Sequence, residues 1–268
     1  MTQKTASLKI DLNNHLLLSQ EFSREGDVRE IARLASLSLP HAGDFLNAVP
    51  NPALGLHLRP QELISVLRYR LGCPIFTREG QCPACNRQSD RLGDHAMNCG
   101  NQGERISRHN RLRDALHDTA AAAALGPIKE ERFLLPWEGR RPADVLIPNW
   151  DRGQDAALDV TVINPLQDTK VSGAAAEAGH ALTIAYNRKV RAVGEACQRE
   201  GISFIPLAAE YIGGCHKVAV QEVKKLAGLL AKQQGEEEKE AARRMFQKLS
   251  MLLQRGNSAL FLNRTPDN

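Results

Sequence analysis

The stretch RRPADVLIPNWDRGQDAALDVTVINP, residues 140–165, contains two apolar runs joined by polar residues. The runs predict strands over residues 142–148 and 155–164, and the connecting NWDRGQ is rich in turn formers. Asp144 stands at the head of the first run and Asp159 lies inside the second. Aspartate is depleted in strands, and an unpaired buried carboxylate costs several kcal/mol. We therefore expect Asp159 to have a partner or a chemical task.

The elements that flank this hairpin predict an α/β fold. Apolar periodicity, capping residues and turn residues predict helices over residues 59–72, 104–125, 172–201, 215–232 and 236–255, and further strands over residues 131–137 and 201–211. Ser172 is the expected N-cap of the long central helix. The order of the central elements is therefore α β β β α β, with helical additions at both ends.

The composition is that of a globular protein. Of the 268 residues, 42% are hydrophobic and 25% are charged, which excludes a wholly disordered chain. The net charge of +4 is compatible with nucleic acid but does not argue for it alone. No apolar run approaches the roughly 20 residues that span a bilayer, and Lys9 and Asp11 interrupt the apolar start. We expect an intracellular protein without a membrane partner, nuclear if its source is a eukaryote.

Three of the six cysteines and one histidine are crowded into CPACNRQSDRLGDHAMNC, residues 82–99. Thiolate and imidazole ligands in two close pairs, separated by a short loop, are typical of a tetrahedral zinc site. Four protein ligands leave no open position, so we expect structural rather than catalytic zinc. The alternative is a chance cluster of free cysteines. The predicted zinc ligands are Cys82, Cys85, His95 and Cys99.

The two aspartates of the hairpin predict a second metal site. If the hairpin is centred near residues 151 and 152, position 144 lies opposite about position 159. Like charges that close are unfavourable unless a cation neutralises them, and Mg²⁺ accepts paired carboxylates together with water and phosphate oxygens. We therefore predict a magnesium site at Asp144 and Asp159. The alternative is that Asp144 is a strand-end residue and Asp159 an exposed edge residue.

The long helix carries a lysine on its apolar side. Lys189 falls within a stripe at helical spacing, and a cation on the side that faces the sheet needs an anionic partner. The alternative is that the Lys189 side chain extends along the helix to solvent. The stripe consists of Leu182, Tyr186, Val190, Val193 and Cys197.

A carboxylate pair on a hairpin, within this order of elements, resembles the PD-(D/E)XK nuclease superfamily. In that motif, Pro-Asp is followed by Asp or Glu, any residue, and Lys. Here Pro142 and Asp144 match the first half with Ala143 inserted between them, and Asp159 begins the second half, in which Thr161 stands in place of the lysine.

The superfamily includes members in which the lysine has moved to the following helix. The resemblance therefore makes Lys189 the best candidate for the missing catalytic lysine. Lys170, in the connecting segment, is the second candidate.

With the zinc knuckle and the Arg-His pair of the basic helix, residues 60–215 resemble the restriction-like endonuclease domain of site-specific non-LTR retrotransposon proteins. The length leaves no room for a polymerase domain, so we expect a derivative without reverse transcriptase. The resemblance implies a magnesium-dependent endonuclease that hydrolyses DNA phosphodiester bonds. It implies that Asp144 and Asp159 hold the metal and that Lys189 orients the attacking hydroxide.

The start of the helix over residues 104–125 is the most basic stretch of the chain. Four arginines and His109 lie within residues 105–113 and are expected to contact the phosphates of DNA, with RNA as the alternative. For His109 a packed hydrogen bond is the alternative to a phosphate contact, and a role as replacement zinc ligand is also conceivable. The predicted nucleic-acid-binding residues are Arg105, Arg108, His109 and Arg111.

These predictions divide the chain into four parts: a helical N-terminal segment over residues 1–80, a CCHC zinc knuckle over 81–103, a restriction-endonuclease-like αβββαβ core over 104–214, and C-terminal helices over 215–268. The main alternative function is a catalytically inactive, zinc-containing nucleic-acid-binding module. A protein-binding role for the charged helix over residues 236–254 ranks last, because mixed charge with an apolar stripe usually marks a helix docked on its own domain.

Overall fold

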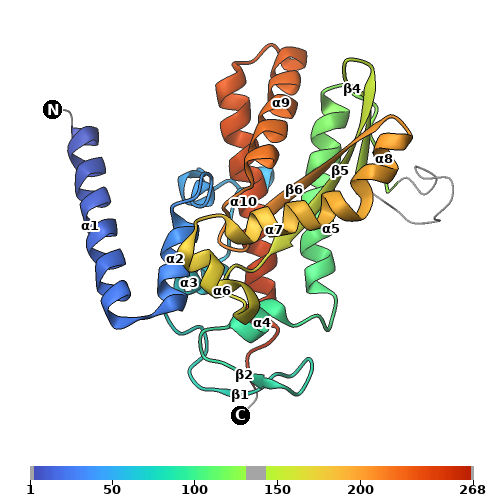
Figure 1. Cartoon of the computed structure of the whole chain (residues 1–268). Helices are drawn as coiled ribbons and strands as arrows, with labels where there is room; N and C mark the ends of the chain where they lie inside the picture. The colour runs from blue at the N-terminus through green and yellow to red at the C-terminus, as the bar shows by residue number, and fades with distance from the viewer. Residues whose placement is uncertain (1–2, 131–142, 267–268) are drawn as a thin grey trace.

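The computed structural model describes residues 3–130 and 143–266, which form a mixed α/β fold (Figure 1). The predicted strand over residues 131–137 and the motif residue Pro142 lie outside these ranges. The helices are α1 (Gln3–Glu25), α2 (Val28–Leu37), α3 (Pro60–Arg70), α4 (Asp94–Asn98), α5 (Glu104–Ala122), α6 (Asp168–Ala176), α7 (His180–Lys189), α8 (Glu195–Arg199), α9 (Lys217–Gln234) and α10 (Glu238–Leu262). The strands are β1 (Gly80–Gln81), β2 (Gln88–Ser89), β3 (Ile128–Lys129), β4 (Val145–Asp151), β5 (Gln154–Ile163) and β6 (Ile202–Glu210).

The central sheet has the order β3-β4-β5-β6, in which β5 pairs antiparallel with β4 and parallel with β6. Val145 lies opposite Leu158, as the predicted hairpin register requires. The hairpin turns at Arg152 and Gly153, which both have positive φ, a backbone typical of a tight two-residue connection. The first strand runs to Asp151, so part of the predicted turn NWDRGQ belongs to β4 instead.

The helices cover both faces of the sheet. Helices α5, α9 and α10 share the large core with one face, and α7 packs on the other (Figure 1). Alternation along β5 separates the two sides, because Leu158 and Val160 join the α5 side while Ile163 joins the α7 side. The odd-numbered residues of β5, Asp159 among them, therefore face α7.

The predicted long helix over residues 172–201 is broken into several pieces, so that prediction is wrong in its continuity. Helix α6 begins after Gln167, and Ser172 lies inside it rather than at its N-cap. The chain leaves helical geometry at Glu177, and α7 starts after Gly179, whose φ of 83° suits glycine best. A single π turn, Val190–Gly194, then links α7 to α8. Of the predicted apolar stripe, Leu182 and Cys197 are buried, and Tyr186 stacks on the His216 ring.

Helix α10 is longer than predicted and is the most buried helix of the C-terminal part. Its last turns place Leu260 and Phe261 in a second core with residues of α2, α3 and α4. In its last third it packs against α5, where Arg108 is only 2% exposed and donates from Nη1 to Asn257 Oδ1 at 2.7 Å. The Arg108 guanidinium also lies 4.2 Å from the centre of the Tyr211 ring. Helix α10 therefore joins the sheet-covering helices to the N-terminal part of the chain.

Helix α1 lies apart from the other helices and contacts α2 (Figure 1). Several of its apolar side chains are exposed, including Ile10 and Leu12. Among the described residues, none of the helices combines the length and the apolarity that a membrane crossing demands.

The close crossing of α5 and α10 generates a stability prediction. A Cβ at Gly256 would lie 2.4 Å from Cγ of Arg108, whereas a Cβ at Gly228 of α9 would meet its nearest atom at an ordinary 3.5 Å. We expect Gly256→Ala to lower the free energy of unfolding by about 1–3 kcal/mol through overpacking. The matched Gly228→Ala should raise it by about 0.4–1 kcal/mol by restricting the unfolded chain. Urea unfolding of both variants measures these changes. If Gly256→Ala were as stable as the parent, the close contact between Gly256 and the Arg108 side chain would be contradicted.

Candidate functional site

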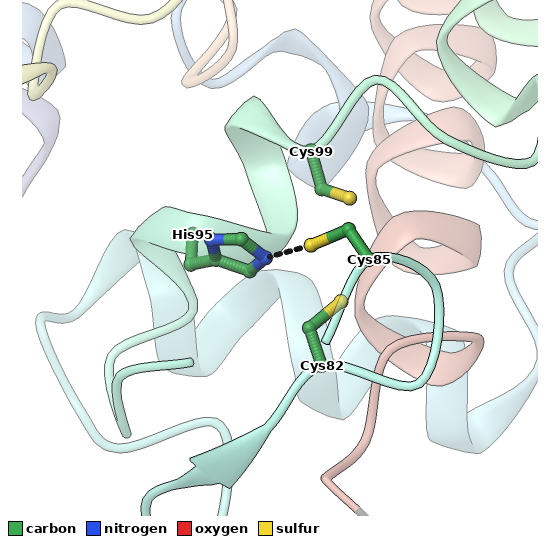
Figure 2. Close-up of side chains that lie close together, drawn as sticks. All are labelled: Cys82, Cys85, His95 and Cys99. Carbon is green, nitrogen blue, oxygen red and sulfur yellow. Dashed lines mark hydrogen bonds between the residues drawn. The ribbon is translucent and has the colours of Figure 1, made fainter. Parts of the chain in front are cut away.

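Two constellations of polar side chains are candidates for function, and the first is the cysteine cluster. The side chains of Cys82, Cys85, His95 and Cys99 converge on one point (Figure 2), and their ligand atoms all lie within 4.8 Å of one another. The Sγ atom of Cys85 lies 3.2 Å from Nε2 of His95. No other group of three or more potential metal ligands converges in this way within the two described ranges. The four side chains can hold a metal ion such as zinc, as the spacing predicted.

Local backbone structure explains why the four side chains meet. Cys82 and Cys85 lie in the turn of the small β1-β2 hairpin, where the amide of Asn86 donates to the Cys82 carbonyl at 2.8 Å. His95 lies in the short helix α4 and Cys99 directly follows it, and the Cys99 amide donates to the His95 carbonyl. Asp90 caps this helix by accepting hydrogen bonds from its first amides. Each ligand pair is thus held by one backbone turn.

The electrostatic environment suits metal binding. Burial lowers the pKa of His95, which favours the neutral imidazole that ligates metals. Burial alone would raise the pKa of Cys99, but the adjacent Arg264 guanidinium brings it below its usual value and favours the thiolate. Arg264 is fully buried and donates to Glu104 Oε2 at 2.7 Å, so the residue beyond the end of α10 links the cluster to the start of α5. The donor set and its surroundings therefore fit a thiolate-binding cation.

The cluster generates a prediction about metal content. We expect the purified protein to contain one equivalent of zinc, and Cys85→Ser to lose it and to melt at a lower temperature, because closed structural zinc sites contribute to folding free energy. Cys73→Ser is the matched control, because Cys73 is an exposed cysteine outside the cluster. Elemental analysis and thermal unfolding measure both effects. A metal-free parent with the same melting curve as Cys85→Ser would refute the site.

The second constellation is formed around the two hairpin aspartates. The Asp144 amide donates to the Leu158 carbonyl at 2.9 Å, which places Asp144 beside Asp159 across the hairpin. Nζ of Lys189 lies 3.0 Å from Oδ1 and 2.9 Å from Oδ2 of Asp159. The prediction that Lys189 faces the sheet and meets an anionic partner is confirmed. Lys170, the second candidate, contacts Gln167 instead.

Thr161, which stands in the position of the motif lysine, contributes to the same group. Its Oγ1 donates to Asp159 Oδ2 at 3.1 Å. Asp159 is 8% exposed, so the expectation of an exposed edge residue does not hold. Burial raises the pKa of Asp159 and the nearby Asp144 charge raises it further, while Lys189 opposes both effects. Lys189 therefore favours the ionised form of Asp159 against the effects of burial and of Asp144.

His109 is a member of this site that the sequence did not place there. Its Nε2 lies 2.9 Å from Oδ1 of Asp144, and Oδ2 of the same carboxylate accepts the Val160 amide at 2.6 Å. The hydrogen bond to Asp144 raises the pKa of His109 despite partial burial. The sequence placed His109 near a phosphate or in a packed hydrogen bond but did not identify Asp144 as its partner, and His109 is not a member of the cysteine cluster. Each of the two aspartates thus has one nitrogen-bearing side-chain partner, His109 for Asp144 and Lys189 for Asp159.

The basic start of α5 divides into exposed and structural arginines. Arg105 and Arg111 are exposed, as a nucleic-acid contact requires. The prediction that Arg108 contacts nucleic acid as an exposed residue is wrong, because its side chain is buried against α10 and Tyr211. Arg113 is paired with Asp114 and Glu130. The one-turn spacing of Arg105, Arg108 and Arg111 could not reveal which of them the helix buries, because that depends on the packing of α10.

No known family model matches this chain, and none of the curated proteins matches it in sequence. The function therefore has to be inferred from the residues and their geometry.

The pair of His109 and Asp144 generates a pH prediction. Because the pKa of His109 is raised in the folded state, its contribution to stability is present in full below its ordinary pKa of about 6.5 and is lost as pH rises through the raised value. We expect His109→Gln to reduce the free energy of unfolding more at pH 6 than at pH 9. Denaturant unfolding across this range measures the difference. In an Asp144→Asn background the pH-dependent part should vanish, and its persistence there would show that Asp144 is not the cause.

Proposed function

We propose that this protein is a magnesium-dependent endonuclease that hydrolyses phosphodiester bonds of DNA. The observation that carries the proposal is the contact of Lys189 Nζ with both carboxylate oxygens of Asp159, beside Asp144. It supplies the cation that a PD-(D/E)XK site needs and that Thr161 cannot provide. The order α5, β3, β4, β5, α6 to α8, β6, with an antiparallel hairpin and a parallel last pair, supports a restriction-endonuclease-like core.

The donor set fits a hard divalent cation. Two carboxylates in close reach offer oxygen ligands, which Mg²⁺ and Mn²⁺ accept together with water and phosphate oxygens. A cation bound by Asp144 and Asp159 would acidify a water molecule and offset the negative charge of the phosphate. The side chains of Asp144 and Asp159 are 14% and 11% exposed, so a small part of each carboxylate is accessible from outside.

The side chains of the site have separable tasks in this proposal. Lys189 orients the attacking water and offsets the charge that develops on the phosphate, because its ammonium group is held beside the Asp159 carboxylate that would bind the metal. His109 holds one oxygen of Asp144 while the Val160 amide holds the other, so the orientation of that carboxylate is set before substrate arrives. Asp159 receives the same support from Thr161.

The remaining features position the substrate. Arg105 and Arg111 lie on the helix that also carries His109, so phosphates bound by these arginines would be held near the carboxylates. A structural zinc ion in the cysteine cluster would stabilise the segment before α5. This combination supports derivation from the restriction-like endonuclease of a non-LTR retrotransposon protein.

The alternative is a catalytically inactive nucleic-acid-binding module with the same fold. One observation favours it: His109 and Lys189 already contact both carboxylates, as the partners in a structural polar network do. Under this alternative, DNA binding should fall steeply with salt while no bond is cleaved.

The two functions are separated by a nicking assay. We expect the protein with Mg²⁺ or Mn²⁺ to convert supercoiled plasmid to nicked circles. Asp159→Asn should abolish this conversion, because it removes an anionic metal ligand. Lys189→Met should lower the rate at least a hundredfold with little change in DNA affinity, as expected for an interaction made chiefly in the transition state.

Lys170→Met is the control for the lysine, because Lys170 contacts Gln167 rather than a carboxylate. It should nick like the parent. DNA binding without nicking by the parent supports the inactive module, and full activity of Lys189→Met would remove the proposed role of that lysine.

A further inference from the structure

A pocket of about 340 Å³ lies between Gly100, which follows the cysteine cluster, and the start of α5. Its lining residues are Gly100, Arg105, Ile106, Arg108, His109 and Val162. His109 belongs both to this pocket and to the aspartate site, because it lines the pocket and holds Asp144 through Nε2 at 2.9 Å. A ligand in this pocket is therefore in contact with the side chain that orients a candidate metal ligand.

One wall of the pocket is apolar and exposed. Ile106 is 65% exposed although it stands in the most basic stretch of the chain, one turn before His109. A single exposed isoleucine is ordinary on a protein surface. Here it lines a concave site together with the half-buried Val162, so the two aliphatic side chains offer a surface on which a flat ring can pack. Aliphatic side chains inserted beside bases are a common means of unstacking DNA.

The other side of the pocket is positively charged. Arg105 is exposed, and its Nη1 donates to the carbonyl of Asn98 at 3.3 Å. Arg108 lies beneath, buried, and among the described residues it has no carboxylate partner. The Nε atom of Arg108 is also buried, and it has no hydrogen-bond partner within residues 3–130 and 143–266. A buried guanidinium whose charge no carboxylate balances gives the pocket a positive potential, which favours an anionic ligand.

We propose that this pocket binds a single nucleotide that has left the base stack, with its base against Ile106 and Val162 and its phosphate near Arg105. The inference rests on the proposed nucleic-acid function of the neighbouring site and adds a substrate class to it: DNA with an unpaired or locally melted nucleotide beside the bond to be cut. The cost of unstacking is lowest for a base that is already unpaired, so the protein prefers such DNA to an intact duplex.

The test uses two duplexes of the same sequence, one intact and one with a single bulged 2-aminopurine. Binding of the full chain is measured by anisotropy without added Mg²⁺, and the 2-aminopurine fluorescence reports the surroundings of the base. The parent should bind the bulged duplex at least fivefold more tightly than the intact one, because a base that is already unpaired costs least to unstack. Its binding should also change the fluorescence of the bulged base.

Ile106→Ala should bring the ratio of the two affinities close to one and remove the fluorescence change, while affinity for the intact duplex changes less than twofold. Ile64→Ala is the matched control, because Ile64 is 53% exposed on α3 and does not line the pocket. It should retain the parental ratio. A parent without preference for the bulge, or an Ile106→Ala variant with the parental ratio, overturns the inference.

The outcomes also separate this inference from the endonuclease proposal. If the preference for the bulge depends on Ile106 but the plasmid is never nicked, the pocket stands and the endonuclease proposal fails. If the plasmid is nicked but bulged and intact duplexes bind equally, the endonuclease proposal stands and the pocket fails.

Discussion

The burial of a carboxylate in the central strand is the constraint around which the candidate catalytic site is arranged. β5 lies between β4 and β6, so Asp159 has little access to water and needs a cation and a hydrogen-bond donor within reach. Lys189 meets this need because α7 crosses the same face of the sheet and ends at that residue. The π turn follows immediately, and such irregular turns occur often at functional sites.

Helix α10 contacts the elements that support both candidate sites. It packs against α5, which carries His109, and its crossing point requires a glycine because the Arg108 side chain fills the space. Beyond its end, Arg264 lies beside Cys99 and pairs with Glu104 at the start of α5. One helix therefore contacts the supports of both constellations, and its position determines how the cysteine cluster and the aspartate pair are placed relative to α5.

The parts of the fold that the sequence predicted well depend on short-range periodicity. The alternation of apolar residues in the hairpin set the register that brings Asp144 beside Asp159, because a shift of one residue would turn every side chain to the other face. The helical spacing around Lys189 placed that side chain toward the sheet. The prediction of one long helix over residues 172–201 was wrong because the alanine-rich middle of this stretch continues a helical pattern. A local signal for the break was Gly179, which has a positive φ.

The sequence by itself determined the cysteine cluster and the pairing of the two aspartates, because backbone turns and strand alternation act over a few residues. The tertiary structure alone decided that Arg108 is buried while Arg105 and Arg111 are exposed, since the packing of α10 selects which side of α5 is covered. It also decided that His109 contacts Asp144. These residues are separated by 35 positions, and their meeting depends on how a helix and a sheet cross, which no local pattern encodes.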